Sequence, residues 1–165
     1  MDSSIIITFA IPLFFGLILI EFFYGILTKQ NNYRINDAIT SMSLGLISRF
    51  VPILGLGFQY VVYKAVAEHY NLKLLNSEEI WVWVTAFVLY DLCYYWMHRI
   101  HHEIKVFWAT HVVHHHGEEF NLSTALRQTS TGFLWKWVFF LPLFMIGIPP
   151  HIYVAVAGLN MIYQF

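Results

Sequence analysis

The chain has 165 residues, of which 58% are hydrophobic and only 12% charged, and its formal net charge is −1. Soluble domains carry roughly a quarter charged residues, so this composition predicts a protein that is embedded in a lipid bilayer. The charge balance gives no basic surface for nucleic acid. The single cysteine, Cys93, excludes an intrachain disulfide and any metal site built from several thiolates.

The first half of the chain contains two long apolar stretches. Residues 4–27 lack the basic leader of a secretory signal and are too long for its apolar core, so we expect a retained transmembrane helix. Residues 40–67 are interrupted by Pro52, Gly55 and Gly57, which favours a kinked helix or a re-entrant hairpin. Residues 68–79 form a polar connection.

The second half begins with an apolar stretch from Ile80 to Met97, followed by a polar, histidine-rich segment to about residue 132. Two further apolar runs cover 133–147 and 151–165, with Pro149 and Pro150 between them. The sequence therefore predicts an all-α, polytopic membrane protein with four to five transmembrane or re-entrant helices. We expect one membrane-embedded domain over residues 1–165, and one that is incomplete at its C-terminus because Phe165 falls within an apolar run.

The positions of lysine and arginine predict an orientation. If the N-terminus lies outside, the 28–38 loop and the histidine-rich segment lie inside, with five basic residues against one in the 68–79 connection. The histidines are therefore expected on the cytosolic face, of an inner membrane in bacteria or of the endoplasmic reticulum in eukaryotes.

Seven of the nine histidines fall between residues 98 and 116. His98 and His102 are four residues apart, so a helix places them on one face, about 6 Å apart. His111, His114 and His115 have spacings of three and four and also share a helical face. The eight residues between these two sets allow the chain to turn, so that five imidazoles meet at one point.

This ligand set indicates a metal site. Imidazole suits iron, zinc, copper and nickel, and five nitrogens exceed the four ligands of a closed zinc site. Two metal ions would use all five and require more, which we expect from residues beyond Phe165. His101 and His116 fall off the two faces and are expected outside the ligand set or exposed, and His69 and His151 are expected to be solvated.

Three charged residues lie within apolar stretches. Asp91 is seven residues before His98, on the same helical face and about 10 Å away along the axis. A carboxylate there is costly unless it is paired, so we expect Asp91 to orient a ligand imidazole or pair with a cation, with Tyr95 and Arg99 beside it. Glu21 is expected to reach the interface, and Arg49 to extend its charged end to the interface or to pair.

Two motifs at this point resemble the fatty acid hydroxylase and sterol desaturase superfamily. They are DLCYYWMHRIHH over residues 91–102 and FWATHVVHHH over 107–116, which follow the pattern His-Arg-x-x-His, a Trp, then His-x-x-His-His. FNLSTALRQTS (120–130) and NMIYQF (160–165) are more similar to the alkylglycerol monooxygenase branch. The chain resembles an N-terminal fragment that lacks the third histidine box, and His116 stands where a serine is usual.

The resemblance implies a non-haem di-iron oxidoreductase, a hydroxylase or desaturase that uses O₂ to attack an unactivated C–H bond of a sterol, fatty acyl or ether lipid. It implies two iron ions as cofactor, bound by His98, His102, His111, His114 and His115, and a reduced pterin or an electron-donor protein as reductant. Two alternatives remain open: a histidine-rich membrane metal transporter or sensor, and a catalytically inactive relative that acts as an interaction protein.

Overall fold

The computed structural model describes residues 3–30, 32–54, 57–75 and 79–164, and all regular secondary structure in these ranges is helical. This confirms the all-α prediction. The elements are α1 (Ser3–Thr28), α2 (Ile35–Leu54), α3 (Phe58–His69), α4 (Ile80–Glu103), α5 (Lys105–His115), α6 (Leu122–Ala125), η1 (Gly132–Leu134), η2 (Lys136–Phe140), α7 (Leu141–Ile146) and α8 (Pro150–Gln164).

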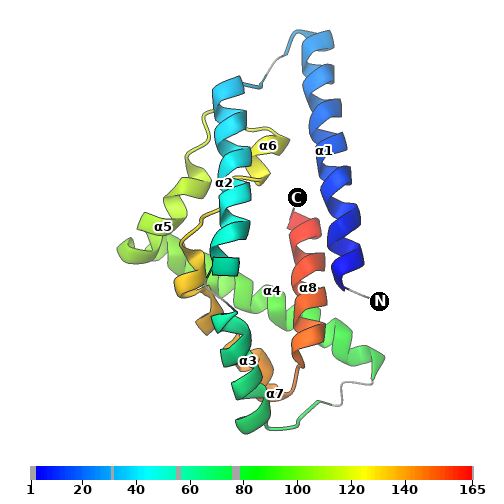
Figure 1. Ribbon diagram of the computed structural model, residues 1–165, viewed down its shortest axis with the longest axis vertical. Coiled ribbons are helices and arrows are strands. Elements are labelled where there is room, and N and C mark those ends of the chain that lie inside the picture. The colour runs from blue at the N-terminus through cyan, green and yellow to red at the C-terminus, as the bar shows by residue number, and fades with distance from the viewer. Residues whose placement is uncertain (1–2, 31, 55–56, 76–78, 165) are drawn as a thin grey trace.

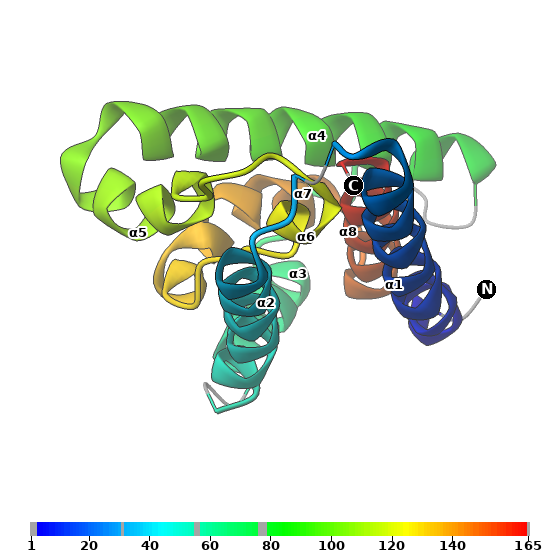
Figure 2. The same cartoon turned by 90° about the horizontal axis from the view of Figure 1, so that it is seen from above.

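The long helix α4 organises the molecule. In Figure 1, α1, α2 and α8 run roughly along the long axis of the view, while α4 crosses behind them. Figure 2 shows α4 along one side, with the remaining helices extending from that side. α4 contacts α5, α8, η2 and α7, so the segment that carries the first two clustered histidines is also the one on which the C-terminal half packs.

The core lies between α4 and the C-terminal helices. Buried residues of α4 recur at helical spacing, at Val82, Ala86, Tyr90, Met97 and His101. This stripe packs against apolar and aromatic residues of α3, η2, α7 and α8. The aromatic rings of this core include two stacked pairs, Tyr63 with Phe144 and Tyr90 with Phe140. The stripe fixes the rotation of α4 about its axis, and it thereby decides which face of α4 turns toward α5.

The interrupted stretch 40–67 forms two helices. α2 ends at Leu54 and α3 begins at Phe58 after Gly57, whose φ of 69° lies in the left-handed region that glycine adopts without strain. Gly55 lies outside the described residues. α2 thus continues two residues past Pro52, and the interruption expected in this stretch is a break between two helices.

One helix in the described ranges, α4, is long and apolar enough to cross a membrane. Shorter apolar helical segments cover residues 12–28 and 136–146. Four to five spans are therefore not established, and that number stays a prediction. Large apolar side chains are exposed along α1, α2 and one face of α4, including Val84, Val88 and Leu92.

Glu21, an acid within an apolar helix, closes a contact between α1 and α6. Its carboxylate accepts hydrogen bonds from the Tyr33 hydroxyl and, at 2.8 Å, from the backbone N–H of Leu122, the first residue of α6. Asn121 caps the same helix by accepting a bond from the Ser123 N–H at 3.0 Å. The carboxylate of Glu21 therefore connects α1 to the start of α6, whereas the sequence interpretation expected this side chain to reach the interface. The side chain of Arg49 lies outside the described residues.

Candidate metal centre

The end of α4 and the whole of α5 form a helical hairpin that carries the histidine cluster. α4 ends at Glu103, and Ile104 has an extended backbone with φ −104° and ψ 121°, so a single residue separates the two helices. This turn is tighter than the loop expected over residues 103–110, most of which is already helical. Because the turn is so short, the last turn of α4 faces α5 directly.

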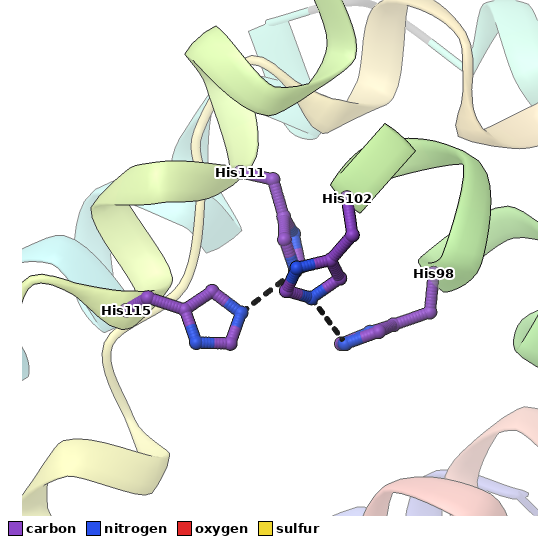
Figure 3. A group of neighbouring side chains, drawn as sticks. All are labelled: His98, His102, His111 and His115. Atoms are coloured by element: carbon purple, nitrogen blue, oxygen red, sulfur yellow. Dashed lines mark hydrogen bonds between the residues drawn. The ribbon is translucent and has the colours of Figure 1, made fainter. Parts of the chain in front are cut away.

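Four imidazoles converge inside this hairpin. His98, His102, His111 and His115 each offer a ring nitrogen, and these nitrogens all lie within 4.8 Å of one another (Figure 3). The Nε2 atoms of His98 and His102 are 3.0 Å apart, and those of His111 and His115 are 3.1 Å apart. Two nitrogens at adjacent corners of an octahedron, each about 2.1 Å from a metal, are separated by about 3.0 Å. Within each pair, the two Nε2 atoms thus have the spacing of ligands to one metal ion.

His114, the fifth predicted ligand, lies beside the four. Its ring centroid is 5.1 Å from that of His115 and 5.5 Å from that of His111. Its Nδ1 lies 2.7 Å from the backbone carbonyl oxygen of Arg127, so Nδ1 must carry the proton and donate it. In the neutral ring Nε2 then keeps its lone pair, which is the arrangement seen in histidines that bind metal.

The surroundings of His111 and His115 favour neutral imidazoles, the form that binds metal. His111 is 5% exposed. Burial, and secondarily the neighbouring histidines, lowers the pKa of His111 to about 3. The pKa of His115 is lowered by burial and then by His114 and His102. In addition, the buried Nδ1 atom of His98 has no hydrogen-bond partner among the described residues. The donor set therefore fits a metal ion that prefers nitrogen ligands.

The remaining histidines divide between core and surface. His101 was expected outside the ligand set or exposed; it is fully buried, with Nδ1 2.6 Å from the carbonyl oxygen of Met97, and its ring lies against Phe107. His116, His69 and His151 are exposed. None of these four belongs to the group of converging nitrogens.

The three residues expected to support the ligands lie apart from the converging nitrogens. Asp91 accepts a hydrogen bond from Asn160 of α8 at 3.1 Å. Arg99 bonds Glu103 at 2.8 Å and the Tyr95 hydroxyl at 3.2 Å on an exposed face of α4. Their assignment to the metal centre stays a prediction.

Trp108 is a neighbour of the cluster to which the sequence interpretation gave no role beyond its place in the motif. Its ring stacks on His115 with centroids 5.7 Å apart and lies 5.3 Å from His102. The signal was present in the spacing, because residues 108, 111 and 115 share a helical face. Arg127, whose carbonyl orients His114, is distant in sequence and left no comparable signal.

Comparison with known proteins identifies the family. The sequence model described as fatty acid hydroxylase matches residues 83–165, which include the whole hairpin. The chain belongs to the fatty acid hydroxylase family. The resemblance noted in the two histidine motifs is thereby confirmed.

Relatives of this chain include proteins named alkylglycerol monooxygenase. The chain is 40% identical to the Danio rerio protein and 38% identical to the Homo sapiens protein, over 157 residues that cover 94% of this chain and 35% of each relative. It is 35% identical to the Xenopus tropicalis protein over 152 residues, which cover 92% of this chain and 34% of that one. The chain thus spans about a third of their length. No solved structure matches it.

Proposed function

We propose that this chain carries part of the metal centre of a membrane-bound lipid hydroxylase that oxidises the ether-bearing carbon of an alkylglycerol. The observation that carries the proposal is the convergence of His98, His102, His111 and His115 in one hairpin. The similarity to alkylglycerol monooxygenases supports the reaction class and the substrate.

We assign two iron ions to the centre, held by the four converging histidines together with His114. Five imidazoles exceed the needs of a single tetrahedral ion, and nitrogen ligands without thiolate suit non-haem iron. Bound iron would supply the reductive activation of O₂ that an unactivated C–H bond requires. A reduced pterin or an electron-donor protein is the proposed source of electrons.

The residues of this chain would hold and shield the centre. The short α4–α5 turn fixes the two histidine pairs against each other, and the Arg127 carbonyl fixes the proton of His114 on Nδ1. The Trp108 ring lies against His102 and His115 and would limit the access of water from that side. The exposed apolar face of α4 would contact lipid, and we place the histidines at the cytosolic face.

The balance of the reaction defines its products. One oxygen atom of O₂ enters the C–H bond next to the ether oxygen, and the other leaves as water with two electrons and two protons from the reductant. The product is a hemiacetal, which breaks down to an aldehyde and glycerol. No side chain of this chain needs to act as acid or base on the substrate.

The test uses the full-length natural protein, purified in detergent and supplied with iron, a reductant and ¹⁸O₂. An alkylglycerol, a free fatty acid and a sterol of comparable size are offered separately. We expect aldehyde and glycerol from the ether alone, with ¹⁸O found in the aldehyde under conditions that limit exchange with water. Oxidation of the sterol or the fatty acid instead would contradict the substrate assignment, and metal transport into vesicles without oxidation of any lipid would contradict the enzyme.

The matched variants are His111→Ala, which removes a converging imidazole, and His69→Ala, which removes an exposed one outside the cluster. We expect the first to abolish turnover and the second to retain it. Equal activity of the two variants would contradict the assignment of the centre.

A further inference from the structure

One face of α2 contacts the segment that orients His114. Asp37, Ser41 and Gly45 are spaced by four residues and therefore lie in one row along the helix. The contacts of all three converge on two consecutive residues, Leu126 and Arg127. The carbonyl of Arg127 is the one that accepts the hydrogen bond from His114.

The first two contacts are polar and buried. The Arg127 guanidinium lies 2.5 Å from the Asp37 carboxylate, and the side chains are only 6% and 11% exposed. The same guanidinium bonds the Ser41 hydroxyl at 3.2 Å and the carbonyl of His116 at 3.1 Å. A buried ion pair is a poor source of stability compared with apolar packing, but it fixes geometry when each donor has a partner. Here the Arg127 guanidinium connects Asp37 of α2 to the backbone of His116, the residue after His115.

The third contact is a close approach of two backbones. A Cβ atom built on Gly45 would lie 2.5 Å from the carbonyl oxygen of Leu126, closer than side-chain carbons come to backbone oxygen. Because glycine has no Cβ, α2 can lie directly against the 126–127 peptide. Any larger residue at position 45 would displace this peptide, and with it the acceptor of His114.

We propose that the row Asp37, Ser41 and Gly45 of α2 is a positioning device for the metal centre, which sets the Arg127 carbonyl and thereby holds the Nε2 atom of His114 toward the other histidines. The proposal rests on metal binding by the cluster, as proposed above. It makes α2, which contributes no ligand of its own, a determinant of metal affinity. Outer partners of this kind typically change metal affinity by about 10- to 100-fold when removed.

The experiment measures metal binding directly, without turnover. The full-length protein is stripped of metal and titrated with Co²⁺, whose visible spectrum reports the number and arrangement of its ligands. Gly45→Ala is compared with Gly16→Ala, since Gly16 in α1 has no atom within 4 Å of its built Cβ. We expect Gly45→Ala to raise the Co²⁺ dissociation constant by about 10- to 100-fold and to alter the spectrum, while Gly16→Ala behaves as the natural protein does.

Two milder variants keep the test decisive if Gly45→Ala fails to fold. Asp37→Asn removes the charge but keeps the shape, and Ser41→Ala removes one acceptor. Arg34→Gln is their control, because the exposed Arg34 side chain forms ion pairs with exposed Glu118 and, at 3.2 Å, with half-buried Glu119. We expect Asp37→Asn and Ser41→Ala to bind Co²⁺ more weakly than the natural protein, with the larger loss of affinity in Asp37→Asn. Arg34→Gln should bind Co²⁺ as the natural protein does. Arg127→Lys should restore part of the affinity lost in Arg127→Met, because lysine can still pair with Asp37.

The melting temperature of the metal-free variants separates positioning from general destabilisation. Natural Co²⁺ affinity and spectrum in folded Asp37→Asn and Ser41→Ala would overturn the inference. So would a loss of affinity in Gly16→Ala or Arg34→Gln equal to that in the α2 row. If the α2 variants lose Co²⁺ as expected but the natural protein oxidises no lipid, the proposed function fails while this inference stands.

Discussion

The Nδ1 atom of His114 donates a hydrogen bond to the backbone carbonyl of Arg127, 13 residues further along the chain, at 2.7 Å. The bond decides which ring nitrogen carries the proton, and so which one is free to bind metal. It also links the α5 histidines to the segment that α6 and α2 hold. The ligand set of the proposed centre therefore depends on helices that contribute no ligand themselves.

His114→Asn tests the roles of the two ring nitrogens of His114 separately. The amide nitrogen of asparagine occupies nearly the position of Nδ1, so it can still donate to the Arg127 carbonyl, whereas nothing replaces Nε2. We expect a melting temperature of the metal-free protein within a few degrees of the natural value, and a loss of at least about tenfold in metal affinity. The affinity is measured by Co²⁺ titration. Undiminished binding would remove His114 from the ligand set.

The lowered pKa of His111 predicts how the stability of the metal-free protein depends on pH. In the unfolded chain the imidazole titrates near 6.5, whereas in the folded protein its pKa is about 3. Between these values the unfolded state binds more protons, so the free energy of unfolding falls as pH decreases from about 6.5 toward 3. The slope from His111 alone approaches about 1.4 kcal/mol per pH unit.

Denaturant unfolding of the metal-free protein at a series of pH values checks this dependence. His111→Gln, which cannot titrate, should show a shallower fall over the same interval. A natural protein whose stability is constant between pH 6.5 and 4 would contradict a buried, neutral His111.

Trp108 is expected to protect the centre through its ring. His115 and His102 are exposed, and Trp108→Ala would expose both rings further and let both imidazoles change orientation. We expect about a tenfold loss of lipid turnover, with a smaller loss in Trp108→Phe because phenylalanine keeps a ring over the histidines. Lipid oxidation and Co²⁺ affinity are measured for both variants. Equal losses in the two variants would show that the ring has no such role.

The hydrogen bond between Asp91 and Asn160 is expected to fasten α8 to α4. Asn160 is 2% exposed, and its amide donates to the Asp91 carboxylate at 3.1 Å. A double-mutant cycle with Asp91→Ala and Asn160→Ala should give a coupling free energy of about 1–3 kcal/mol in unfolding experiments. Additive effects would show that the bond contributes nothing. A parallel Co²⁺ titration of Asp91→Ala tests the separate prediction that Asp91 orients a ligand.

The metal centre could be predicted from the spacing of the histidines, because the positions of side chains along a helix depend only on local sequence separation. His98 with His102, and His111 with His115, are pairs at i and i+4, and the structure brings each pair to a nitrogen separation near 3 Å. The turn at Ile104, which brings the two pairs together, is sharper than the eight-residue spacing predicts. Residues 105–110 contain no strong helix breaker, so α5 begins at once.

The contacts between distant segments could not be read from the sequence. Glu21 capping α6, Gly45 meeting the Leu126 carbonyl and Arg127 orienting His114 each join positions far apart in the chain. Glycine and charge at these positions are compatible with many local roles, and only the tertiary packing selects one. The burial of His101 has the same origin, since it continues the stripe by which α4 packs on the core.

The iron content of the full-length protein, purified in detergent after expression with ample iron, is the decisive measurement, together with the lipid-dependent consumption of O₂. We expect about two iron ions per chain, with substantially less in His111→Ala and no change in His69→Ala. Fewer than about one iron ion per chain in the natural protein, together with no O₂ consumption when an alkylglycerol and a reductant are added, would contradict this expectation.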